Sequence, residues 1–283
     1  LEDHSMINRL LIMKKDQWKD LGRLRKTIQE VIELKKSLAG GRYDVCIDLS
    51  GLLRSGLISW ASKAPMRIGF QESDEGSPYF YSHKVHGSME IHAIDRYLEI
   101  AKFMGCDTSR IEYPFAPYDP SPAALADLPE KFVIICPSAG KPANRWPAHR
   151  FGQLALKLDL PVIVIASAAE ADIAEEVVRH SKGKAVSLAG RTSLKELIAL
   201  ISRATYFICN DTGPMHIAAA LNIPVFAVFG PANPVRTGPY GNIHTVIQQK
   251  MTCAPCYAKK PCSHFKCMND LSVDAVLEQI QKK

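Results

Sequence analysis

The chain has 283 residues, more than the roughly 100 to 150 residues of an ordinary domain, so we expect two domains. Its apolar runs fall far short of the roughly 20 residues of a membrane-spanning helix, and its first residues lack a signal-peptide pattern, which predicts a cytoplasmic protein without a transmembrane segment. The formal charge of +6 comes from the second half, where we expect anionic ligands, but the excess is too modest and too poor in interleaved aromatics for nucleic acid.

The first half opens with helix and strand patterns. Apolar residues recur at helical spacing over residues 17–38, and Gly40 and Gly41 end the pattern. Residues 44–50 then have the continuous apolar character of a buried strand, and residues 51–60 have helical spacing. This alternation is typical of an α/β domain.

Proline marks the boundary between the domains. Residues 113–129 contain five prolines, too many for a helix or a central strand to run through the segment. We therefore place the linker here and predict domains at 1–125 and 126–283.

The second half alternates strands with helices. The predicted strands are residues 132–137, 162–166, 206–210 and 225–230, and the predicted helices lie near residues 150–158, 170–181, 193–203 and 214–221. Continuous apolar strands between helices indicate a parallel sheet covered on both faces. Ligands of such sheets bind beyond the carboxyl ends of the strands, so the loops after these four strands are the candidate site.

The loop after the first of these strands, residues 137–147, is rich in small residues. The backbone at Ser138, Ala139 and Gly140 can approach an anion closely, and Lys141 and Arg145 can add positive charge. Taken alone, the loop is explained equally well as a plain connection.

The next two loops each offer one candidate side chain. Glu170 can accept hydrogen bonds from ribose hydroxyls, although the helix dipole alone favours a glutamate in a first turn. Arg191 can reach a base or a phosphate, or it can be an ordinary surface arginine beside the capping box that we predict for Ser193 and Glu196.

The loop after the strand at residues 206–210 is the most informative. Gly213 allows an unusual backbone angle, and the free amides at the start of the following helix attract phosphate. Asp211 and Thr212 add a carboxylate and a hydroxyl, and His216 lies on the first helical turn. The alternatives are that Asp211 caps the helix and that His216 is a core histidine, but the combination favours a site.

Seven of the eight cysteines fall into two kinds. Three lie in apolar strand-like runs and are predicted core residues: Cys46, Cys136 and Cys209. Four lie close together, and zinc binding is the minor alternative to ordinary thiols because the second pair lacks zinc-knuckle spacing: Cys253, Cys256, Cys262 and Cys267. Four lysines in the same stretch can meet an anionic acceptor or lipid head groups, or form a solvated basic face: Lys250, Lys259, Lys260 and Lys266.

Several segments together resemble one known family. They are Asn210-Asp-Thr-Gly-Pro-Met-His216 with the alanines after it, residues 228–234 and 238–241, the pair Trp146-Pro147, residues 188–197 and residues 43–55. They are similar to glycosyltransferase family 9, the ADP-heptose:lipopolysaccharide heptosyltransferases.

This resemblance implies an α/β protein of GT-B architecture, with two Rossmann-like, doubly wound parallel-sheet domains facing a cleft. The carboxyl-terminal domain would hold the nucleotide-sugar donor and the amino-terminal domain the acceptor. The implied reaction is inverting transfer of heptose from ADP-heptose to the inner core of lipopolysaccharide, at a Kdo or heptose acceptor of the lipid A-core. It needs no cofactor, and its lipid acceptor implies peripheral contact with the cytoplasmic face of the inner membrane.

The same resemblance implies roles for the candidate residues. Glu170 would bind the ribose, and Asp211, Thr212, Gly213 and His216 would surround the diphosphate and the sugar. The backbone of residues 138–140 would complete the phosphate site. The implied donor-binding set also includes Asn144, Arg145, Gly190 and Arg191, and Lys141 and Asp211 are the catalytic candidates.

Two departures from the family pattern stand out. Asn144 occupies the position of a usual lysine that neutralises leaving-group charge, so Lys141 or Arg145 would have to substitute. The chain also resembles the family only from its third strand region, near residues 1–12. An initial βαβ portion of roughly 50 residues, with the proposed catalytic base, would be missing, and the incomplete first sheet should expose apolar surface.

These departures keep a second hypothesis open, a non-catalytic nucleotide-sugar-binding module derived from such an enzyme. A dinucleotide-dependent oxidoreductase is disfavoured, because the sequence lacks a G-x-G-x-x-G turn after an early strand.

Overall fold

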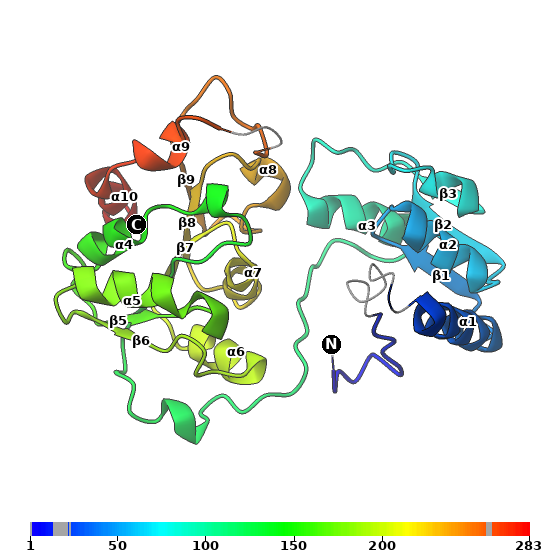
Figure 1. Cartoon of the computed structure of the whole chain (residues 1–283), viewed down its shortest axis with the longest axis horizontal. Coiled ribbons are helices and arrows are strands. Elements are labelled where there is room, and N and C mark those ends of the chain that lie inside the picture. Colours follow the sequence, from blue (N-terminus) through cyan, green and yellow to red (C-terminus); the bar gives the residue numbers. More distant parts are fainter. Residues whose placement is uncertain (1, 14–21, 23, 259–261) are drawn as a thin grey trace. The chain divides into compact units, whose positions relative to one another are not determined.

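The protein is described by a computed structural model that covers residues 2–13, 22, 24–258 and 262–283. Its contacts define two compact units, Leu1–Ile111 and Glu112–Lys283 (Figure 1). The proline-rich segment belongs to the second unit. Within it the short 3₁₀ turn Ala123–Leu125 buries Leu125, whose carbonyl accepts a hydrogen bond from Arg203 Nη1 at 3.0 Å. Our predicted boundary at residue 125 therefore falls within a segment that packs on the second unit.

The first unit is a small parallel α/β layer. Its strands are β1 (Val45–Asp48), β2 (Met66–Phe70) and β3 (His83–Val85), in the order β1-β2-β3. Its helices are α1 (Leu24–Gly40), α2 (Leu53–Ala61) and α3 (Ala93–Phe103), with a 3₁₀ turn at Ser77–Phe80. The predicted strand at 44–50 and helix at 51–60 are confirmed, and α1 confirms the later part of the helix predicted over 17–38, whose residues 17–21 and 23 lie outside the described residues.

Two features of this unit bear on the sequence analysis. Residues 2–13 form turns and irregular structure, so the strand inferred for this region is not found there. Apolar side chains around β1 and α2 are exposed, as expected: Leu49 is 45% exposed, Leu57 45% and Trp60 56%.

The second unit contains one six-stranded parallel sheet. Its strands are β4 (Val133–Cys136), β5 (Val162–Val164), β6 (Ala185–Ser187), β7 (Tyr206–Asn210), β8 (Val225–Phe229) and β9 (Thr245–Gln248). Their order is β6-β5-β4-β7-β8-β9, so the direction of winding reverses between β4 and β7. This is the doubly wound order of nucleotide-binding sheets.

Helices cover both faces because alternate strand residues point to opposite sides. One core contains Val133, Ile135 and Val164 and is covered by α4 (Ala148–Ala155), α5 (Ala171–His180) and α10 (Val273–Gln281). The other contains Ile134, Ile163 and Phe207 and is covered by α6 (Leu194–Ser202) and α7 (Gly213–Ala220). Two single-turn helices, α8 (Pro234–Thr237) and α9 (Lys266–Asn269), follow β8 and β9. The predicted α/β class with doubly wound parallel sheets is confirmed.

The sequence analysis did not identify β2 and β3 of the first unit, and the two strands that it did not identify in the second unit lie at the sheet edges. β6 is three residues long and partly exposed, and β9 is only partly buried, so neither has the continuous apolar run of a central strand. Among the described residues, no helix is both long and apolar enough to cross a membrane.

Candidate functional site

A pocket of about 510 Å³ opens at the carboxyl ends of β4, β7 and β8. It lies where the strand order reverses, which is the usual ligand site of such sheets. Its lining comes from four separate segments of the chain: Gly140, Lys141, Asn144, Asp211, Thr212, Gly213, His216, Ala232, Arg236, Thr237 and Tyr257. Seven of these eleven are residues that the sequence analysis selected, so the first and fourth candidate loops do meet in space.

Asn210, which ends β7, joins the first of these loops to the sheet. Its side chain is fully buried, its Oδ1 accepts a hydrogen bond from Trp146 N at 3.0 Å, and its Nδ2 donates to Pro137 O at 2.7 Å. One amide thus holds both ends of the loop at residues 137–147. Asn210 was not a candidate in the sequence analysis, because an asparagine at a strand end carries no signal of such a pairing.

Asp211 lies beside Asn210 and faces the pocket. Its Oδ2 accepts a hydrogen bond from Asn144 Nδ2 at 3.2 Å. Burial raises the pKa of Asp211 above its ordinary value, and the positive charge of Lys141 opposes that rise. The neutral Asn144 therefore orients this carboxylate without adding the charge that a lysine would supply.

Two of the three small residues before Lys141 are buried, which differs from the open anion-binding loop that the sequence suggested. Ser138 and Ala139 are 5% and 1% exposed, and the Ser138 hydroxyl has no hydrogen-bond partner among the described atoms. Only Gly140 of this trio lines the pocket. Lys141 is exposed, and its Nζ donates to Tyr257 O at 3.4 Å.

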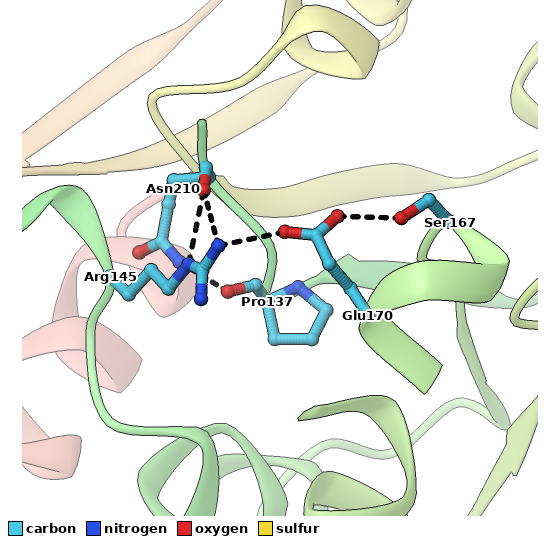
Figure 2. A network of polar contacts seen from close by, with 6 residues as sticks. Pro137, Arg145, Ser167, Glu170 and Asn210 are labelled. Atoms are coloured by element: carbon cyan, nitrogen blue, oxygen red, sulfur yellow. Dashed lines mark hydrogen bonds and ion pairs between the residues drawn. The ribbon is translucent and has the colours of Figure 1, made fainter. Parts of the chain in front are cut away.

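Arg145 connects the first loop to the second instead of entering the pocket. Its Nε and Nη2 donate to Ala139 O at 3.0 and 2.8 Å, and Nη2 also donates to Glu170 Oε1 at 2.9 Å. Glu170 Oε2 accepts from the Ser167 hydroxyl at 2.9 Å. Figure 2 shows Glu170 contacted by Arg145 on one side and Ser167 on the other, so the carboxylate is fixed in orientation and its remaining lone pairs can accept hydroxyl groups.

We expect Glu170→Gln to weaken ADP binding by about 10- to 100-fold, the value of one or two hydrogen bonds to a charged group. Arg145→Gln should act in the same direction, because it releases the carboxylate. Calorimetric titration with ADP and with 2′-deoxy-ADP measures the effect, and both variants should discriminate less between the two ligands than the unmodified protein does. Glu175→Gln, on the exposed side of α5, is the matched control. Full discrimination in Glu170→Gln would remove this residue from the ribose site.

The third loop packs closely against the second. Gly190 has a φ of +66°, and a Cβ there would lie 2.9 Å from the Cα of Ala168. Its amide donates to Ala166 O at 3.0 Å. The capping box is confirmed, since Ser193 and Glu196 exchange side-chain and backbone hydrogen bonds. Arg191 is exposed and does not line the pocket.

The amino terminus of α7 faces the pocket. Thr212 is its N-cap residue and makes no side-chain capping bond, and His216 is exposed, so the core-histidine alternative is wrong. Our expectation for Gly213 is also wrong, because its φ is not positive. A Cβ at Gly213 would meet nothing within 4 Å, so the glycine keeps space open at the helix start.

Of the three predicted core cysteines, two are buried and Cys46 is not. Cys136 and Cys209 are buried neighbours on β4 and β7, and burial raises the pKa of both thiols, to about 12 for Cys136. Cys46 is half-buried in β1. The four cysteines of residues 253–267 are free thiols, and no three metal-ligating side chains within the described ranges are grouped to hold a metal. Lys259 and Lys260 lie outside the described residues.

Two curated relatives and one solved structure are similar to this chain. The chain is 27% identical to the lipopolysaccharide core heptosyltransferase OpsX of Haemophilus influenzae, over 89% of this chain and 78% of the relative. It is 28% identical to lipooligosaccharide heptosyltransferase 2 of Campylobacter jejuni, over 90% and 79%. The structure of E. coli heptosyltransferase WaaC with ADP-2-deoxy-2-fluoro heptose superposes with a TM-score of 0.76 at 20% identity, covering 99% of this chain and 84% of that one.

The family model for glycosyltransferase family 9 (heptosyltransferase) matches residues 31–267. This range contains the whole pocket and most of both units. The chain therefore belongs to glycosyltransferase family 9, the heptosyltransferases.

Proposed function

We propose that this glycosyltransferase transfers heptose from ADP-heptose to the inner core of lipopolysaccharide, with a Kdo or heptose residue of the lipid A-core as acceptor. The names of the relatives and the ligand of the WaaC structure support the donor and the acceptor class. The observation that carries the proposal is the pocket itself. It combines the open amino terminus of α7 and two cationic side chains at the strand-order reversal with the carboxylate of Asp211, which accepts a hydrogen bond from Asn144.

The pocket and the loop after β5, whose Glu170 does not line the pocket, together offer contacts for the parts of the donor. Glu170 lies after β5, at the sheet position from which an acidic residue reaches ribose hydroxyls. The amides at the start of α7 and the side chain of Lys141 would hold the diphosphate, and Asp211 and His216 would face the sugar. An acceptor hydroxyl then attacks the anomeric carbon in a single inverting displacement, its proton passes to a carboxylate base, and ADP leaves with the bonding electron pair.

The alternative is a nucleotide-sugar-binding module without activity. The observation that favours it is Asn144, a neutral residue bonded to Asp211 at the position where the family pattern has a lysine. Calorimetric titration with ADP, beside a transfer assay with ADP-heptose and deacylated core acceptor, separates the two. Binding with transfer supports the enzyme, binding without transfer supports the module, and absence of binding contradicts both.

The lipid acceptor also leads us to propose that the protein works at the cytoplasmic face of the inner membrane, by peripheral contact. Sedimentation with vesicles containing lipid A-core, compared with vesicles lacking it, tests this. Equal recovery in the supernatant of both would contradict it.

We expect Gly213→Val to lower ADP affinity by at least about 10-fold while the fold is kept. The new side chain would project into space where no atom lies within 4 Å, so it occupies pocket volume without a clash, and a lost diphosphate contact is worth about 1.5 to 3 kcal/mol. Calorimetry with ADP and a thermal melt provide the two measurements. Gly40→Val, which also meets open space but lies in the first unit, is the control. Unchanged ADP affinity in Gly213→Val would place the diphosphate elsewhere.

A further inference from the structure

A departing nucleoside diphosphate needs positive charge to stabilise it. Two positions that were expected to supply this charge do not supply it. Arg145 directs its guanidinium to Ala139 O and Glu170, and Asn144 is neutral. Arg191 does not line the pocket. Of the lysines and arginines in the part of the chain that is described, those lining the pocket are Lys141 and Arg236.

Arg236 lies in α8, immediately after β8, and it is half-buried. Its segment is held from several sides. Asn233 caps α8 by accepting from Val235 N at 3.0 Å, and Gly238 N donates to Pro234 O at 2.8 Å. A Cβ at Gly238 would lie 2.5 Å from the same carbonyl, so the end of α8 requires a glycine at this close approach.

The loop between β8 and α8 is also held by hydrogen bonds. Gln248 Nε2 donates to Gly230 O at 2.9 Å, and Tyr257 N donates to Pro231 O at 2.7 Å. Tyr257 also accepts the hydrogen bond of Lys141. The backbone that carries Arg236 is therefore held in place at one side of the pocket. It is bonded to Tyr257, the residue that accepts a hydrogen bond from Lys141.

Sheet order places the two cations on opposite sides of the helix terminus. Lys141 follows β4 and Arg236 follows β8, and β7, which leads into α7, lies between those strands. A diphosphate seated on the free amides of α7 would thus have Lys141 on one side and Arg236 on the other.

We propose that Arg236 is a catalytic residue that binds the sugar-bearing phosphate of the donor and stabilises the charge that develops on it. This inference rests on the proposed function. In the transfer step the bond between the anomeric carbon and the phosphate oxygen breaks, and its electron pair stays on that oxygen. The oxygen of the acceptor hydroxyl forms the new bond to the anomeric carbon, and the hydroxyl proton passes to a carboxylate base. The leaving phosphate gains negative charge and needs no proton from Arg236, whose planar guanidinium can donate two parallel hydrogen bonds to it.

The test compares Arg236→Gln and Arg236→Lys with the unmodified chain, using calorimetric titration with ADP and with AMP and a transfer assay. AMP lacks the second phosphate, so the ratio of the two affinities isolates the contact. Arg236→Gln should lose at least about 10-fold in ADP affinity with AMP affinity unchanged, and about 10²- to 10³-fold in kcat. Arg236→Lys should recover part of both, because it keeps the charge but not the bidentate geometry.

Arg179→Gln, in the last turn of α5, is the matched control, and it should keep the affinities and kcat of the unmodified chain. Wild-type values for both nucleotides and for kcat in Arg236→Gln would overturn the inference. Equal losses for ADP and AMP would also overturn it, because they would mean a contact to the first phosphate or a structural role. If Arg236→Gln does not fold, the same comparison in Arg236→Lys decides. Failure of the unmodified chain to bind ADP would instead contradict the proposed function itself.

Discussion

Asp211→Ala is expected to abolish measurable transfer, with a fall in kcat/KM of at least about 10²- to 10³-fold, the usual effect of removing a polar group that contacts the reacting centre. Asp211 lines the pocket where β7 meets α7, and Asn144 holds its carboxylate in place. Loss of the side chain removes that contact and also frees Asn144. Asp211→Asn keeps the shape and removes the charge, so it should lose activity to a similar extent. Unchanged ADP titration curves and full activity in Asp211→Ala would exclude the residue from the site.

The substitution Asp211→Asn should not destabilise the fold. Burial raises the pKa of Asp211, so the folded chain holds this proton at pH values where the unfolded chain has lost it. The free energy of unfolding therefore falls as pH rises from the unfolded pKa through the raised folded pKa, and the penalty is fully present above the folded pKa. Asp211→Asn removes it, so its Tm at pH 7 should equal or exceed that of the unmodified chain. A marked drop in Tm, still present at acidic pH, would mean that the carboxylate is structural.

Asn210→Ala should produce the largest loss of stability, about 2 to 5 kcal/mol in the free energy of unfolding. Two buried groups, Trp146 N and Pro137 O, lose their partner, and each unsatisfied buried group costs about 1 to 3 kcal/mol. Urea unfolding at 25 °C measures the change. The loop at residues 137–147 should also loosen, so ADP affinity should fall in the fraction that remains folded.

Asn242→Ala, at an exposed position of the same unit, is the control and should change stability by less than about 0.5 kcal/mol. Asn210→Asp provides a second comparison. It can still accept from Trp146 N, but it cannot donate to Pro137 O and it buries a charge, so it should also be destabilised. Wild-type stability in both variants would mean that the loop is held by other contacts.

The central strands could be predicted because burial on both faces demands continuous apolar runs, as in β4 and β8. The same physics explains the failures at β6 and β9, since an edge strand is only partly buried. Loops that follow the central strands could be selected as a site for a topological reason, and the pocket lies among them.

The roles of individual polar side chains were harder to predict. Arg145 was a candidate for phosphate charge, but it reaches Glu170, because a guanidinium pairs with whatever oxygen the folded loop brings near it. The sequence analysis interpreted Asn144 as the loss of a positive charge. Its hydrogen bond to Asp211 could not be predicted, because the two residues are 67 positions apart in the chain. Arg236 carried no signal in the sequence, because it lies between the family-like segments 228–234 and 238–241 and only the fold brings α8 to the same pocket as α7. The functional roles of these residues stay predictions.

The order of strands in the second unit also has a consequence for how the chain is made. β4 is synthesised well before β7, yet Val133 pairs with Tyr206 across the sheet. During translation β4 can pair with β5 first. The other edge of β4 stays unpaired until the residues of β7 have left the ribosome. The nucleotide pocket does not exist until that long-range pairing closes, so ADP can stabilise the finished fold without guiding its formation. Until then the edge of β4 that later binds β7 is unpaired and can pair with other strands.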